Sequence, residues 1–98
     1  MNVIWTTEAE ADLYAWLDYM ESRNPIAGEQ ITEMVLASAA SLSDMPQMGR
    51  NGAVYGTREL KVTGTPLRII YTVRDKAVVI LFIPHDRQKW PPALPNTQ

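Results

Sequence analysis

The sequence LRIIYTVRDKAVVILFI, at positions 67–83, decides the fold. Two apolar runs, residues 67–73 and 77–83, flank three charged residues at positions 74–76. Runs rich in β-branched and aromatic residues, separated by a short polar segment, are typical of two strands joined by a turn. The stretch therefore predicts an antiparallel hairpin whose second strand is buried.

A third strand precedes this hairpin. Residues 57–62, TRELKV, alternate between polar and apolar side chains, which is the period of a strand with one buried face. The turn sequence TGTP at positions 63–66 connects it to the hairpin, so the three strands form an antiparallel meander. Residues 47–56 contain three glycines and no regular period, and they predict a loop.

The alternation assigns side chains to the two faces of the predicted sheet. If Leu60 and Val62 face the core, Glu59 and Lys61 face away from it. Arg58 then has core-side parity, which predicts a structural role at the strand edge or in a pair with a helix carboxylate. In the next strand, the core side receives Ile69, Tyr71 and Val73, and the open side receives Arg68, Thr72 and Arg74.

The first half of the chain has a helical period instead. Residues 1–5 predict a short strand, and Thr7 with Glu10 has the form of a capping box that opens a helix. Asn24 and Pro25 separate this helix from a second one, which residues 43–46 end. Two helices joined by so short a connection pack antiparallel. The apolar stripes are Leu13, Trp16, Leu17 and Met20 in the first helix and Ala27, Ile31, Met34, Val35, Ser38 and Leu42 in the second.

The predicted fold class is α+β, with an N-terminal short strand, an antiparallel two-helix hairpin and a three-stranded antiparallel meander. The 98 residues suffice for one domain, which we place at residues 1–91, followed by a Pro-rich tail at residues 92–98. No stretch has the length of a membrane span and the N-terminus lacks a secretory signal, so we expect a cytoplasmic protein without membrane contact.

The composition excludes several kinds of site. The chain has no cysteine and a single histidine, so we expect neither a disulfide nor a thiolate or histidine-based metal centre, and no cofactor. The net charge of -2 and an isoelectric point of about 5.2 argue against bulk electrostatic attraction to nucleic acid.

Polar residues gather after the last strand, where residues 85–90 read HDRQKW. Such a cluster at the end of a core strand can carry a functional site, although a solvated tail has the same composition. The face of the predicted sheet turned away from the helices carries Glu59, Lys61 and Arg68. One face of an antiparallel sheet is commonly exposed to solvent, however, and carries such residues without a functional role. Whether His85 lies beside them depends on the strand register.

Six segments, in this order, resemble the RelE/ParE superfamily of bacterial toxins from type II toxin–antitoxin modules. They are Trp5–Leu13, Asn24–Pro25, Leu42 with Pro46 and Gly49–Arg50, Gly56–Leu60, Thr65–Tyr71 and His85–Pro91, and together they cover essentially residues 3–91. The resemblance implies a helical hairpin packed on a small twisted sheet. It also implies a cognate antitoxin that wraps the toxin, and contact with operator DNA only through that antitoxin.

The superfamily divides by mechanism. RelE-like members cleave messenger RNA in the ribosomal A site without a metal, which makes them endoribonucleases. Carried over by position, Arg68 matches an arginine that contacts the scissile phosphate, and Lys61 and Glu59 lie where the first meander strand supplies catalytic groups. His85 or Arg87 matches an acid, a base or a phosphate ligand. ParE-like members instead poison DNA gyrase by binding it.

Two departures favour the ParE-like interpretation. RelE-like ribonucleases are strongly basic, unlike this chain, and their tyrosine-bearing terminal segment is replaced here by QKWP at residues 88–91. Trp90 either stacks on a base or folds back over the sheet edge. The predicted target- or phosphate-binding residues are Arg68, Arg87, Lys89 and Trp90. A detoxified relative that only binds antitoxin and tunes repression of its own operon is a third alternative.

The antitoxin itself is expected beside Trp16, Met20 and Met34 on the helical hairpin, and along an open sheet edge. Its binding segment should be amphipathic, with several acidic residues if it also covers Lys61, Arg68 and Arg87. The competing interpretation is that the two methionines pack entirely against each other inside the hairpin.

Overall fold

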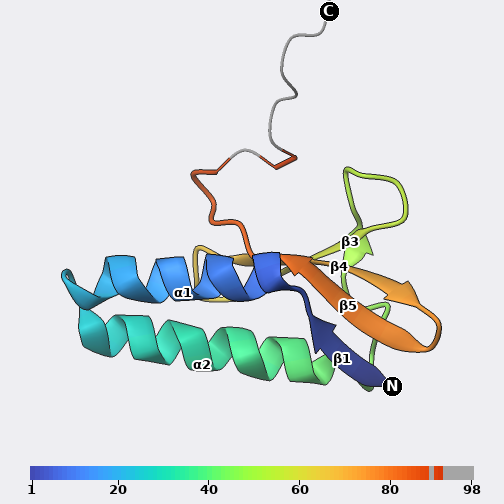
Figure 1. Ribbon diagram of the computed structural model, residues 1–98, viewed down its shortest axis with the longest axis horizontal. Coiled ribbons are helices and arrows are strands. Elements are labelled where there is room, and N and C mark those ends of the chain that lie inside the picture. The colour runs from blue at the N-terminus through green and yellow to red at the C-terminus, as the bar shows by residue number, and fades with distance from the viewer. Residues whose placement is uncertain (89, 92–98) are drawn as a thin grey trace, which may run out of the picture.

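The computed structural model describes residues 1–88, 90 and 91, and it confirms the predicted α+β class. The elements are β1 (Asn2–Trp5), α1 (Thr7–Glu21), α2 (Pro25–Ser41), β2 (Arg50–Asn51), β3 (Arg58–Lys61), β4 (Arg68–Arg74) and β5 (Ala77–Phe82). The two helices run side by side as an antiparallel pair, and the strands form one twisted sheet (Figure 1). In the described part of the chain, neither helix is long and apolar enough to cross a membrane.

The sheet has five strands in the order β1-β5-β4-β3-β2. The predicted meander β3–β4–β5 is antiparallel throughout, and β1 adds to it in parallel with β5. Asp75 and Lys76 at the β4–β5 turn both have positive φ, of 52° and 62°. Two such residues in succession match the right-handed twist of the flanking strands, which explains why this hairpin needs only a short turn.

The start of α1 differs from the prediction. Thr6, not Thr7, is the N-cap residue, since its Oγ1 accepts a hydrogen bond from the Ala9 backbone N–H at 3.1 Å. The same hydroxyl donates to the Leu81 carbonyl at 3.0 Å. With the cap at Thr6, the third helical position is Ala9 rather than Glu10, so the predicted capping box is wrong. The neighbouring strand β5 selects which of two adjacent threonines caps the helix.

The predicted start of α2 is confirmed. The Asn24 side chain accepts from the Ala27 backbone N–H at 3.1 Å, and Pro25 occupies the first helical position. The two helices approach closely at Gly28, where a Cβ atom would lie 2.8 Å from the Cβ of Met20. The lack of a side chain at Gly28 therefore permits the tight packing at the closed end of the hairpin.

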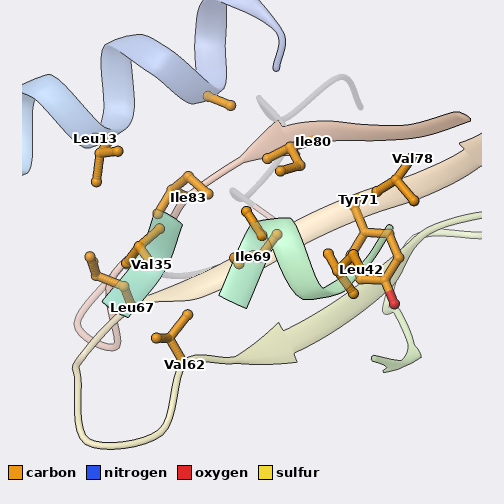
Figure 2. Packing of buried hydrophobic residues seen from close by; sticks show 12 residues of the cluster. Leu13, Val35, Leu42, Val62, Leu67, Ile69, Tyr71, Val78, Ile80 and Ile83 are labelled. Carbon is orange, nitrogen blue, oxygen red and sulfur yellow. The ribbon is translucent and has the colours of Figure 1, made fainter. Parts of the chain in front are cut away.

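The core lies between the helical hairpin and one face of the sheet. Figure 2 shows Leu13 of α1 pointing toward the sheet, from which Ile69, Tyr71 and Ile80 point back. Val73 has the predicted core-side parity but is 41% exposed, because it lies beside the β4–β5 turn, at the end of the strand. The buried cluster comprises Ala9, Leu13, Val35, Ala39, Leu42, Val62, Leu67, Ile69, Tyr71, Val78, Ile80 and Ile83.

The segment predicted as a loop, residues 47–56, contains the short strand β2, which pairs antiparallel with β3. Arg58 has the structural role expected of it, although its partner is not a helix carboxylate. Its guanidinium donates to the Gly49 carbonyl at 2.7 Å. The Tyr71 hydroxyl contacts the same segment. It accepts a hydrogen bond from the Gly49 N–H at 2.9 Å and donates one to the Pro46 carbonyl at 2.8 Å. These long-range bonds order a stretch that has no periodic sequence.

Candidate functional site

The face of the sheet turned away from the helices, here called the open face, carries a buried ion pair. Glu59 is only 6% exposed, and its Oε1 accepts from Arg68 Nη1 at 3.1 Å. Its Oε2 accepts from the Ala53 backbone N–H at 2.8 Å, and Arg50 Nη2 lies 3.9 Å from Oε1. Each carboxylate oxygen of Glu59 therefore has a hydrogen-bond donor from within the protein.

The pairing of β3 with β4 explains this contact. Lys61 lies directly opposite Arg68, and Glu59 lies opposite Ile70, so all four side chains project to the same face. The guanidinium of Arg68 reaches diagonally to Glu59, and its Nε is buried without a hydrogen-bond partner in the described part of the chain. The predicted sharing of one face by Glu59, Lys61 and Arg68 is confirmed.

A second ion pair joins Lys61 to Asp86, a residue that the sequence reasoning did not select. Lys61 Nζ lies 2.9 and 2.7 Å from the two carboxylate oxygens and donates to the Thr65 carbonyl at 2.7 Å. The Asp86 backbone N–H donates to the Pro66 carbonyl at 2.7 Å, which fixes the aspartate beside the turn. The one available signal was that Asp86 is the only carboxylate in the polar cluster after β5.

His85 does not share the open face with these charges. It forms an isolated antiparallel bridge with Leu67, whose side chain belongs to the core cluster on the helix side. Residues opposite each other in such a bridge project to the same side, so the backbone register places Pro84 and Asp86, rather than His85, on the open face. A catalytic role for His85 stays a prediction, and this register puts its side chain away from Arg68.

Trp90 lies against the open face. Its ring centroid is 4.8 Å from that of Phe82, at an interplanar angle of 44°. Phe82 is opposite Ile70 in the sheet, and Ile70 is fully buried. Trp90 thus folds back onto the sheet, which was one of the two predicted positions for it. Arg87 is exposed and forms no ion pair among the described residues, whereas Lys89 lies outside them.

The three residues predicted to bind the antitoxin have different environments. Trp16 packs against the core cluster, Met20 is half-buried against Gly28, and Met34 is 43% exposed on α2. The two methionines therefore do not pack entirely within the hairpin. An open groove of about 290 Å³ lies nearby, and none of the three lines it. Its lining is Trp5, Glu10, Leu13, Tyr14, Leu17, Thr32 and Leu36.

The chain is similar to several known proteins. The family described as ParE toxin of type II toxin-antitoxin system, parDE, matches residues 3–90. The chain is 39% identical over 84 residues to toxin RelE2 of Caulobacter vibrioides, covering 86% of this chain and 93% of the relative.

Two solved structures have the same fold. One is the chromosomal ParDE TA system from P. aeruginosa, with 26% identity, a TM-score of 0.81 and coverage of 87% of this chain and 95% of that chain. The other is a YoeB/ParE toxin from Agrobacterium tumefaciens, with 14% identity, a TM-score of 0.60 and coverage of 87% and 98%. The second likeness concerns the fold alone.

Proposed function

Because the chain belongs to the ParE toxin family of type II toxin–antitoxin systems, we propose that it arrests bacterial growth by binding DNA gyrase, without chemistry of its own. One observation carries the choice between this mechanism and RNA cleavage. The charged groups of the open face are engaged with each other, Glu59 with Arg68 and Lys61 with Asp86.

Metal-independent cleavage of RNA needs a base for the 2′-hydroxyl, an acid for the leaving oxygen and cations free to hold the phosphate. Glu59 is buried with both oxygens occupied, and all three donors of the Lys61 ammonium have acceptors. A phosphate would have to displace Glu59 from Arg68 and Asp86 from Lys61. This favours a toxin that acts by binding.

Membership of the family implies a cognate antitoxin. We place its amphipathic segment on the groove of the helical hairpin, where Tyr14 and Leu36 are 65% and 48% exposed. The predicted docking residues Trp16, Met20 and Met34 do not line this groove. Met34 is two positions from both Thr32 and Leu36, so it lies on a different side of α2 from the groove. Apolar residues at helical spacing on the antitoxin would fill such a groove.

The target is tested by expressing the chain alone and with the antitoxin from the neighbouring gene. We expect growth arrest with filaments and DNA-damage signalling, relieved by the antitoxin, and inhibition of gyrase supercoiling by the purified protein. Immediate loss of translation with cut messages would overturn the gyrase proposal in favour of ribosome-dependent RNA cleavage. Normal growth under verified soluble expression would instead indicate a detoxified relative.

The site of antitoxin binding is tested by hydrogen exchange. Binding should slow exchange in α1, α2 and one edge strand of the sheet. Protection confined to residues 47–56 would contradict docking on the hairpin.

A further inference from the structure

A second groove lies on the open face, beyond the ion pairs and near the β4–β5 turn. Its volume is about 340 Å³, and Val79 and Leu81 of β5 form part of its apolar lining. Thr72 and Arg74 of β4 line it as well, together with Tyr55 and its neighbours in the loop between β2 and β3. Neither the ion pairs nor the proposed antitoxin groove includes any of these side chains.

The loop that borders this groove, residues 52–57, projects away from the helices (Figure 1). Its ends are joined by a hydrogen bond from the Gly52 N–H to the Thr57 carbonyl at 2.8 Å. Inside it, the N–H and the hydroxyl of Thr57 both donate to the Val54 carbonyl, at 3.1 and 2.6 Å. The loop is therefore held in one conformation by hydrogen bonds between its own residues.

Two further bonds tie the loop to the sheet. The Ala53 N–H donates to the buried carboxylate of Glu59 at 2.8 Å, and Thr72 Oγ1 donates to the Gly56 carbonyl at 2.7 Å. Gly56 has φ +83°, a conformation that favours glycine at the turn. The conformational entropy of ordering this loop is lost on folding, so a partner that binds it avoids that cost.

Tyr55 stands at the tip of this ordered loop with its side chain completely exposed, at 102% relative accessibility. Val54 beside it is 40% exposed. A fully exposed aromatic ring buries no apolar area when the chain folds, so it adds little to stability. Tyrosine is, however, among the residues that dominate binding energy at protein interfaces. The loop thus presents an anchor that the isolated fold does not use.

Arg74 supplies the polar contact at the same groove. It is exposed and forms no ion pair within the part of the chain that the structure describes. A guanidinium beside an apolar surface is suited to a carboxylate of a partner, held by paired hydrogen bonds. One arginine in the lining and a net charge of -2 favour a protein segment over a nucleic acid.

We propose that the toxin binds its target protein through this groove, with Tyr55 at its rim. The occupant is an extended segment of gyrase that inserts an apolar side chain over Val79 and Leu81 and offers a carboxylate to Arg74. This inference rests on the proposed function, and it assigns target and antitoxin to different surfaces of the molecule.

The test compares Tyr55→Ala and Arg74→Glu with Tyr19→Ala, an exposed tyrosine of α1 that lines neither groove and serves as the matched control. Each full-length protein is assayed for inhibition of gyrase supercoiling, for antitoxin affinity and for its unfolding midpoint. A hot-spot residue typically contributes enough to change affinity roughly 30-fold, so Tyr55→Ala should raise the half-inhibitory concentration by about that factor. Arg74→Glu should also weaken inhibition, and Tyr19→Ala should leave inhibition unchanged.

The outcomes separate this inference from the function on which it rests. Failure of the unmodified protein to inhibit gyrase overturns both. Inhibition that survives in Tyr55→Ala and Arg74→Glu overturns the inference alone. Loss of antitoxin affinity in Tyr55→Ala, with inhibition intact, would assign the groove to the antitoxin. A Tyr55-dependent affinity for duplex DNA, measured by fluorescence anisotropy, would assign it to nucleic acid, and both results overturn the proposal. Unchanged unfolding midpoints show that the variants are folded.

Discussion

The hydroxyl of Tyr71 joins the centre of the sheet to the start of the segment after α2 through two hydrogen bonds, so its removal should be costly. The ring lies in the core (Figure 2), and the hydroxyl contacts the Gly49 N–H at 2.9 Å and the Pro46 carbonyl at 2.8 Å. Tyr71→Phe keeps the ring and deletes both hydrogen bonds. Gly49 is buried and Pro46 is half-buried, so the two backbone groups lose partners that water replaces poorly.

The magnitude follows from the cost of a buried polar group without a partner, about 1–3 kcal/mol each. Since water can reach the Pro46 carbonyl more readily than the Gly49 N–H, we expect a total loss of roughly 2–3 kcal/mol in the free energy of unfolding. For a domain of this size, that loss lowers the midpoint of thermal unfolding by roughly 10–20 °C. Urea denaturation followed by circular dichroism measures it, and Tyr14→Phe on the surface should change stability by less than about 0.5 kcal/mol.

The difference in stability between the unmodified protein and Tyr71→Phe should depend on pH. Burial raises the pKa of Tyr71 above 10.0, although the Gly49 hydrogen bond and the charge of Arg58 partly oppose this effect. Because the unfolded chain ionises this tyrosine more readily, its stabilising contribution is complete below pH 10 and is lost as the pH rises through the folded-state pKa. The stability difference between the unmodified protein and Tyr71→Phe should therefore be constant up to about pH 9 and shrink above about pH 10. A difference below about 0.5 kcal/mol, or one that does not change at alkaline pH, would refute this account of the hydroxyl.

Three other substitutions have defined outcomes. Thr6→Val removes the cap of α1 and should lower the free energy of unfolding by about 1–2 kcal/mol in urea titrations, and an unchanged midpoint would show that the cap is dispensable. Lys61→Met breaks a half-exposed ion pair, so stability should change by less than about 1 kcal/mol and growth arrest should persist; loss of arrest by a folded Lys61→Met protein would support RNA cleavage. Arg68→Ala removes the closer of the two cations beside the buried Glu59 and should lower the free energy of unfolding by about 3 kcal/mol, much of it recovered in the double variant Arg68→Ala/Glu59→Gln. Failure of that recovery in a double-mutant cycle would contradict the assigned pairing.

Local sequence patterns predicted the elements well. The cap at Asn24 followed by Pro25 starts α2 where expected, and the change from a helical period to alternation marks the boundary between hairpin and sheet. These signals depend on residues only a few positions apart, so they can be interpreted without knowledge of the rest of the chain. Alternation likewise predicted that Glu59 and Arg68 lie on one face.

Contacts between segments that are distant in the sequence could not be predicted from local patterns. Thr6 caps α1 in place of Thr7 because the Leu81 carbonyl lies within its reach, and β2 forms because β3 offers it an edge. The partner of Lys61 is Asp86 rather than the neighbouring His85, since the bridge at Leu67 fixes which residue faces it.

The sequence by itself thus determined every element except β2, their order and the face on which most side chains of the sheet lie. Tertiary structure alone decided which of those side chains meet, which charges are paired and which, like that of Arg74, are exposed without an ion pair in the part of the chain that the structure describes. The physical reason is the pleat of the strand. A shift of one residue in register moves a side chain to the opposite face, and that register is set by packing across the whole sheet rather than by any short stretch of sequence.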